Sequence, residues 1–202
     1  NWPEKDHSEL MHAVNNPEDI NLGKREIPFN GVVYIESNDF MEDPPKKYYR
    51  LSPGSEVRLR YSYCIRCHEV IKDDEGNIIE VLCTYDPDTL GKNPEGRKVR
   101  AAIHWVPHNE SINAEVRLYD RTFTVEDPST EKDWKDCFNK NALSILTDCK
   151  LEPSLISAKV GENFQFERKG YFCLDSKDST KDKIIFNRTI ALRDTWAKIN
   201  KS

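Results

Sequence analysis

The stretch YYRLSPGSEVRLRYSYCIRC, residues 48–67, decides the fold that this sequence predicts. Its second half alternates strictly, and the odd-numbered positions hold the apolar and tyrosine side chains Val57, Leu59, Tyr61, Tyr63 and Ile65. A period of two is typical of a half-buried β-strand, because successive side chains point to opposite faces of a sheet. The sequence therefore predicts one strand whose exposed face carries Arg58, Arg60 and Arg66.

The arginines of this exposed face allow two interpretations. A guanidinium group holds five donors in a fixed fork, which suits phosphate oxygens and base edges better than the point charge of a lysine. The plainer interpretation is that these arginines pair with acidic residues on neighbouring strands, where each exposed pair contributes less than ~1 kcal/mol. A Ser-Pro-Gly turn at residues 52–54 separates Arg50 from the strand and would fold it back near the other arginines.

The rest of the chain repeats this pattern of short strands and turns. Turn-forming residues separate the predicted strands, which lie near residues 27–35, 78–85, 98–106, 115–125, 164–174 and 184–192. Only brief helical turns are expected between them. Strands at short intervals with almost no long helix predict an all-β fold, and the length divides most easily into two small barrels.

Composition and charge limit the classes of function. The chain has 202 residues, of which 32% are charged and 37% hydrophobic, as in a globular protein. A net charge of −5 argues against indiscriminate binding of nucleic acid, and no DNA partner is expected. No apolar run is long enough for a membrane helix and no signal peptide opens the chain, so we expect a cytoplasmic protein without a membrane partner.

The six cysteines suggest neither disulfides nor a metal site. Most of them lie within apolar strand patterns, where a free cysteine behaves as a small hydrophobic residue. The motif Cys64-x-x-Cys67-His68 resembles half of a zinc site, but a continuous strand would point its two cysteines to opposite faces. We therefore predict no metal site.

The first residues are interpreted as a connector. Residues 1–22 mix prolines, asparagines and scattered charges without sustained periodicity. The chain begins at Asn1 without a methionine, and we expect a segment of a longer protein whose helical or catalytic part precedes it. Residues 23–100 would then form the first barrel, completed by the last strand near 184–196, and residues 101–183 the second.

Several longer motifs, taken together and in order, resemble the carboxy-terminal anticodon-binding region of glutaminyl-tRNA synthetases. The motifs that carry this resemblance are RLSPGSEVRLRYSY, TYDPDT, EVRLYDR, FQFERKGYFCLDS and FNRTIALRDTW. The resemblance covers the chain from about residue 23 onward. It implies two antiparallel six-stranded β-barrels, of a type shared with a ribosomal protein, that hold three splayed anticodon bases in separate pockets.

The resemblance also implies which side chains contact the anticodon loop of glutamine tRNA. Arg50 corresponds to the residue that contacts the third anticodon base, and Arg58 and Arg60 to those that form the pocket of the first base. Gln165 corresponds to the residue that contacts the central uracil, whose edge offers one donor and one acceptor to a carboxamide. Tyr49 replaces a lysine that is common in the family, and it is a candidate for base stacking.

These residues also have plainer interpretations. Arg58 and Arg60 would pair with acids across the sheet, Arg50 would brace its own turn, and Gln165 would be an ordinary exposed polar side chain. The corresponding region of a glutamyl-tRNA synthetase is one alternative for the whole chain. A non-enzymatic RNA-binding barrel is another.

Neither adenylation motif of class I synthetases, HIGH or KMSKS, occurs in the sequence. We therefore predict no catalytic residue and no cofactor in this segment. The resemblance implies that the parent enzyme uses ATP and Mg²⁺ to attach glutamine to its tRNA. The segment would supply specificity, with the upstream catalytic domain and the anticodon loop as its partners.

Overall fold

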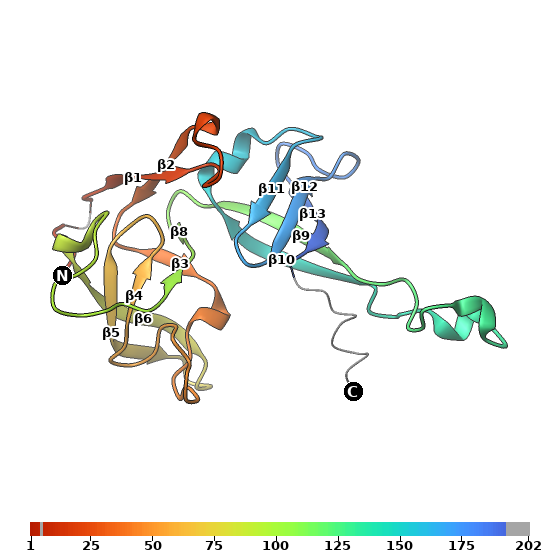
Figure 1. Ribbon diagram of the computed structural model, residues 1–202, viewed down its shortest axis with the longest axis horizontal. Coiled ribbons are helices and arrows are strands. Elements are labelled where there is room, and N and C mark those ends of the chain that lie inside the picture. The colour runs from red at the N-terminus through yellow and green to blue at the C-terminus, as the bar shows by residue number, and fades with distance from the viewer. Residues whose placement is uncertain (5, 193–202) are drawn as a thin grey trace. The chain divides into compact units, whose positions relative to one another are not determined.

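A computed structural model describes residues 1–4 and 6–192, which form two compact units (Figure 1). The first unit comprises residues 1–111 and 152–154, and the second comprises residues 112–151 and those from 155 onward. Both are built from strands, and every helical element in the described ranges is a 3₁₀ helix of three to five residues. The predicted all-β class is confirmed. None of these helices is long or apolar enough to cross a membrane.

The described residues of the first unit form eight strands in three sheets. The strands are β1 (Glu9–Val14), β2 (Lys24–Phe29), β3 (Val33–Ile35), β4 (Glu56–Leu59), β5 (Cys64–Lys72), β6 (Ile78–Asp86), β7 (Ala102–Ile103) and β8 (Trp105–Pro107). The largest sheet has the order β6-β5-β4-β7, while β1 pairs with β2 and β3 with β8. The 3₁₀ helices between them are η1 (Ile20–Leu22), η2 (Ser37–Asp39) and η3 (Pro87–Thr89).

The single strand predicted over residues 56–66 is wrong, because the chain turns back between β4 and β5. Ser62 N donates to Leu59 O at 2.8 Å, Leu59 N donates to Tyr63 O at 2.9 Å, and Tyr61 has a φ of +63°. The register places residue 58 opposite residue 64 and residue 56 opposite residue 66, so residues of equal parity share one face. The alternation therefore passes through the turn in phase, and Val57, Leu59, Tyr63 and Ile65 are buried as predicted, but the even-numbered Ser62 and Cys64, predicted on the exposed face, are buried as well.

Residues 1–22, interpreted as a connector, are built into the first unit. Strand β1 pairs with β2 along its whole length. The ring of Trp2 lies 4.9 Å from that of Phe29 and 5.0 Å from that of Tyr85, measured between ring centroids. A Cβ added at Gly31 would lie 2.5 Å from the Trp2 ring, so this packing also requires a glycine. The segment thus contributes to the core of the unit.

A buried ion pair links β2 to the segment after the second unit's strand β10 (Leu143–Leu151). Nε and Nη2 of Arg25 donate to the two carboxylate oxygens of Glu152 at 2.5 and 2.8 Å, and Nε2 of His104 lies 3.6 Å from the same carboxylate. Burial acts to raise the pKa of Glu152, but the hydrogen bonds and charges of Arg25 and His104 outweigh it and lower the pKa to about 2. Glu152 is therefore charged at neutral pH.

Up to residue 192, the second unit contains one five-stranded sheet of order β10-β9-β13-β12-β11. Its other strands are β9 (Ile112–Tyr119), β11 (Asn163–Phe166), β12 (Gly170–Leu174) and β13 (Ile184–Ala191). Its 3₁₀ helices are η4 (Pro128–Thr130), η5 (Trp134–Cys137) and η6 (Pro153–Ser157), of which the first two residues of η6 belong to the first unit. The core is centred on Val116, Phe172 and Phe186.

Two expectations about the barrels are corrected. The last strand was predicted to complete the first barrel, but β13 lies between β9 and β12 in the second unit, and residues 193–196 lie outside the described residues. Nor are the sheets wholly antiparallel, since β4 pairs with β7 and β9 with β13 in parallel. Within the described ranges the sheets are open, and their pairing does not show six-stranded closure.

Candidate RNA interface

Arg58, on β4, is held by backbone carbonyl groups rather than by an acidic residue. Its Nη1 donates to Ser62 O at 2.9 Å and to Thr89 O at 2.7 Å, and its Nη2 donates to Lys92 O at 2.5 Å. Thr89 itself is buried and accepts a hydrogen bond from Cys64 N through Oγ1 at 2.9 Å. Arg58 therefore fixes the loop that contains η3 to the β4–β5 hairpin. In the described part of the chain its Nε–H has no partner.

Arg60 lies in the turn after β4, and backbone pairing sets its position. Its N–H donates to Ile103 O at 3.0 Å, and its carbonyl accepts from Nε1 of Trp105 at 2.8 Å. Its guanidinium lies 5.2 Å from the ring centroid of Tyr61. Arg60 was predicted on the exposed face of a strand together with Arg58, but it projects from the turn that follows β4 and not from the strand.

Arg50 is anchored to η2. Its Nη1 donates to Asn38 O at 2.9 Å and lies 3.2 Å from Oδ1 of the fully buried Asp39. The hydroxyl of Tyr48 donates to the same carbonyl at 3.1 Å. These contacts use only one edge of the guanidinium, and the described residues offer no partner to its Nε and Nη2. The group is thus fixed in place with donors still available.

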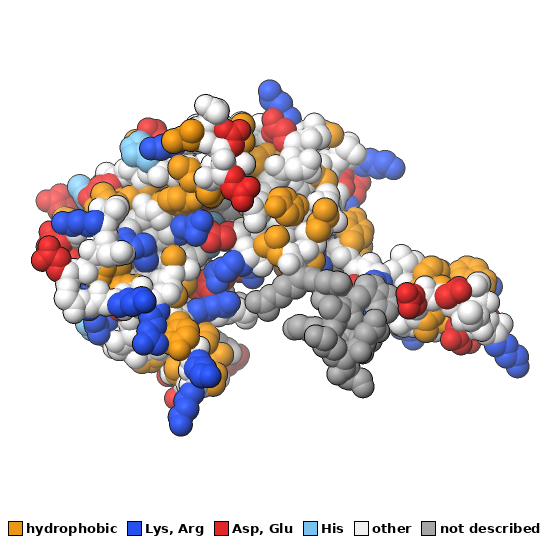
Figure 2. All heavy atoms as spheres, viewed as in Figure 1, with side chains coloured by type: hydrophobic (Ala, Val, Ile, Leu, Met, Phe, Trp, Pro, Cys, Tyr) orange, Lys and Arg blue, Asp and Glu red, His pale blue; other side chains and the backbone are white. Residues whose placement is uncertain are grey.

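Tyr49 exposes about half of its surface beside this anchor, with a relative exposure of 48%. The guanidinium carbon of Arg100 lies 5.0 Å from the centroid of its ring. Arg100 directly precedes Ala101, whose carbonyl accepts from Arg58 N at 2.9 Å. Three predicted arginines, Tyr49 and Arg100 therefore belong to one unit, and Figure 2 shows several Lys and Arg side chains on its visible face.

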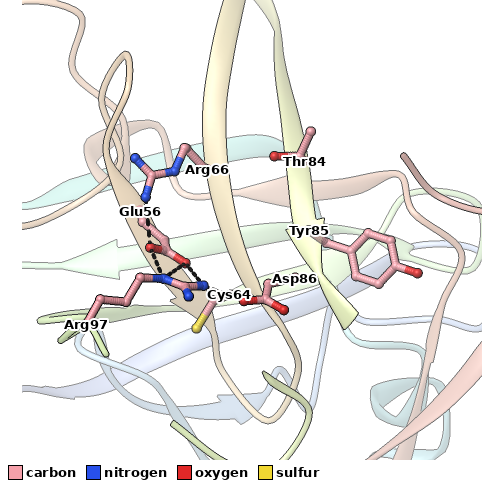
Figure 3. A pocket seen from close by; sticks show the side chains of 7 residues that line it. All are labelled: Glu56, Cys64, Arg66, Thr84, Tyr85, Asp86 and Arg97. Carbon is pink, nitrogen blue, oxygen red and sulfur yellow. Dashed lines mark hydrogen bonds and ion pairs between the residues drawn. The ribbon is translucent and has the colours of Figure 1, made fainter. Parts of the chain in front are cut away.

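A charged hollow of about 300 Å³ lies on the even-numbered face of the same hairpin (Figure 3). Arg97 donates from Nε and Nη2 to the carboxylate of Glu56 at 2.9 Å each and also contacts Asp86. Arg66 pairs with Glu56 at 3.1 Å, which confirms the ion-pair interpretation for this arginine. Hydrogen bonding by Arg97 lowers the pKa of Glu56 and of Asp86. The charges of this hollow are therefore largely compensated.

Gln165 lies on β11 of the second unit, whereas the predicted arginines belong to the first unit. It is exposed and stands directly opposite Tyr171 of β12, which has a relative exposure of 40%. Phe166, on the other face, stacks on Phe172 with ring centroids 4.2 Å apart. The start of β12 requires Gly170, because a Cβ there would lie 2.3 Å from the carbonyl oxygen of Ile190 on the neighbouring strand β13. The predicted outward direction of Gln165 is confirmed.

Sequence reasoning missed Arg100 and Tyr171 as neighbours of the candidate residues. Arg100 lies within the strand predicted near residues 98–106, and nothing in its local pattern indicates contact with Tyr49. Tyr171 lies within the motif FQFERKGYFCLDS, but its place opposite Gln165 follows only from the register of the β11–β12 hairpin. Contacts between segments that are distant in the sequence can be identified only from the fold, whereas the exposed side of each strand can be predicted from the sequence.

Two family models match the chain, and both describe the anticodon-binding domain of class I tRNA synthetases (E and Q). They match residues 1–86 and 102–175. The chain belongs to this anticodon-binding family.

Three similar relatives of the chain are all glutamine–tRNA ligases. The chain is 53% identical over 199 residues to a glutamine–tRNA ligase of Pseudomonas syringae pv. tomato, 52% over 192 residues to that of Vibrio parahaemolyticus, and 51% over 203 residues to that of Rhodopirellula baltica. These matches cover 95–98% of the chain but only 33–35% of each relative. The chain thus spans about a third of the length of these relatives. The predicted likeness to glutaminyl-tRNA synthetases is confirmed.

Proposed function

We propose that this chain binds the anticodon loop of glutamine tRNA and contributes specificity to ATP-dependent attachment of glutamine by a longer protein. One observation carries the proposal: Arg50 and Arg58 are anchored by a buried carboxylate and by backbone carbonyls, yet each retains N–H groups without a partner in the described residues. Anchored side chains lose less conformational entropy when they bind a ligand. Such groups suit recognition of unpaired bases.

Each candidate residue has a separate role in this proposal. Arg50 binds the third anticodon base through Nε and Nη2, the edge that the Asp39 contact leaves unused. Arg58 and Arg60 bind the first base and its phosphate at the β4–β5 turn. Gln165 binds the central uracil from the second unit, and the exposed ring of Tyr171 opposite it offers a stacking surface.

The wider features of the parent protein belong to the same proposal. They comprise closure of the two units into six-stranded barrels, an upstream catalytic domain that uses ATP and Mg²⁺, and a cytoplasmic location. The family match supports the tRNA partner, and the limited coverage of the relatives leaves room for a preceding domain.

A filter-binding comparison tests the proposal. The chain is titrated with the anticodon stem-loop of glutamine tRNA and with the same stem-loop carrying an unrelated anticodon. Each base contact that is lost weakens binding by ~1–3 kcal/mol, so the native sequence is expected to bind at least roughly tenfold more tightly. Equal affinity for the two RNAs would indicate recognition of shape alone, as expected for a non-enzymatic RNA-binding barrel, and would refute the proposed anticodon reading.

A further inference from the structure

Arg100 differs from Arg25, Arg50, Arg58, Arg66 and Arg97 of the first unit in the use of its donors, and like Arg60 it lies over a tyrosine ring. Arg25 and Arg50 contact buried carboxylates, Arg66 and Arg97 share Glu56, and Arg58 donates to three carbonyls. Arg100 is exposed, and in the described part of the chain its guanidinium contacts only the ring of Tyr49, at 5.0 Å. All five of its N–H donors are therefore available to a ligand without breaking a contact within the protein.

Tyr49 supplies the second half of this arrangement. With a relative exposure of 48%, its ring is accessible, and no other aromatic ring of the described residues packs on it. It directly precedes Arg50, whose guanidinium is fixed by Asp39 and by the carbonyl of Asn38. An exposed aromatic face beside the Arg100 guanidinium, on the residue next to Arg50, combines base stacking with contacts to the backbone, as in sites for single-stranded nucleic acid.

We propose that Tyr49 and Arg100 form a further subsite for one unpaired nucleotide of the RNA loop, adjacent to the nucleotide bound by Arg50. The base stacks on the face of Tyr49 that Arg100 leaves open, and the Arg100 guanidinium donates to a phosphate oxygen of the same nucleotide. This inference rests on the proposed function, since it assumes that the first unit binds an RNA loop. An acidic peptide would use the guanidinium but gains nothing from the ring.

Matched variants of the chain separate the subsite from general electrostatics. The variants are Arg100→Ala, Tyr49→Ala, Tyr49→Phe and, as the control, Lys98→Ala. Lys98 is exposed, lies two residues from Arg100, and its side chain makes no hydrogen bond or ion pair within the described residues. Its loss changes the net charge by the same one unit as the loss of Arg100. Affinity for a fluorescent anticodon stem-loop of glutamine tRNA is measured by anisotropy, and thermal unfolding confirms that each variant is folded.

We expect Arg100→Ala and Tyr49→Ala each to weaken binding by roughly 5- to 100-fold, the range that corresponds to loss of one stacked base or one charged fork. Tyr49→Phe keeps the ring and should bind within about twofold of the wild type. Lys98→Ala should lose only the small general attraction of one charge. The double variant of residues 49 and 100 should lose less than the sum of the single losses, because both groups hold the same nucleotide.

The outcomes distinguish this inference from the proposed function. If the wild-type chain prefers the glutamine anticodon but Arg100→Ala and Tyr49→Ala bind like Lys98→Ala, the subsite is refuted and the anticodon proposal stands. If the wild type does not distinguish the two anticodons, the proposed function itself fails. If a glutamate-rich peptide displaces the RNA and binds more weakly to Arg100→Ala but equally to Tyr49→Ala, the site is an anion site for protein and the inference is overturned.

Discussion

The geometry of the Arg25–Glu152 ion pair predicts how much this pair contributes to the stability of the first unit. The carboxylate is buried, with a side-chain exposure of 10%, and both of its oxygens accept from one guanidinium. Removing one partner of such a pair leaves a buried charge uncompensated and costs about 3–5 kcal/mol. We therefore expect Arg25→Ala to lower the free energy of unfolding of the first unit by that amount at pH 7.

The pH dependence of stability gives an independent value for the contribution of this ion pair. The pKa of Glu152 is about 2 in the folded chain against 4.5 as its ordinary value, which corresponds to about 3 kcal/mol of stability at neutral pH. Because the folded pKa is the lower one, this stability is present above about pH 4.5 and is lost as the pH falls towards 2. Relative to Glu152→Gln, wild-type chain should lose ~2 kcal/mol between pH 7 and pH 3.

Unfolding in urea is monitored by hydrogen exchange in peptides from β1 and β2, so that the stability of the first unit is measured separately from that of the second. The exposed pair between Lys72 and Glu42, 2.7 Å apart with side-chain exposures of 40% and 41%, provides the control. Lys72→Ala should cost less than ~1 kcal/mol. A difference between wild type and Glu152→Gln that stays constant from pH 7 to pH 3 would refute this account of the pair.

Three further predictions follow from packing and backbone geometry. Gly170→Ala should destabilise the second unit by more than about 2 kcal/mol in thermal unfolding. The control Gly76→Ala, also at positive φ but with no atom within 4 Å of the added Cβ, should cost about 1 kcal/mol. Equal costs for the two substitutions would contradict the close contact with Ile190. Trp2→Ala should cost about 3 kcal/mol in urea, and an unchanged midpoint would show that the ring contributes nothing to the core. Arg58→Ala should keep its β-strand circular dichroism but expose residues 87–97 to protease, and a loop as resistant as the wild type would contradict the anchoring role.

The sequence predicted the strands best where one face is buried and the other exposed. The odd-numbered residues Val57 and Leu59 are buried as the alternation indicated, and Gln165 points outward between two core phenylalanines. The turn at residues 60–63 was missed because it contains no glycine, proline or asparagine and because its register preserves the parity of the pattern. Periodicity alone cannot distinguish one long strand from a hairpin of this kind.

The features that the sequence did not predict all depend on contacts between segments that are distant along the chain. Strand β10 is interrupted at Asp148, which has a φ of +59° and lies where the register with β9 shifts, so its sequence shows no clean alternation. Trp2 belongs to the core only because Gly31 leaves room for its ring. The partner of Tyr49 likewise lies 51 positions away along the chain, at Arg100. The alternation singled out Arg58 and Arg60, whereas the assignment of Arg50, Arg58, Arg60 and Gln165 to particular anticodon bases came from the family resemblance.

The most direct test of the central claim is a base-by-base specificity profile of the chain and two of its variants. Affinities are measured for the anticodon stem-loop of glutamine tRNA and for stem-loops with a single substitution at the first, second or third anticodon position. We expect each substitution to cost the wild type ~1–3 kcal/mol, with Arg50→Ala losing discrimination only at the third position and Gln165→Ala only at the second. A uniform loss of affinity at all three positions in both variants would contradict the claim that separate side chains read separate bases.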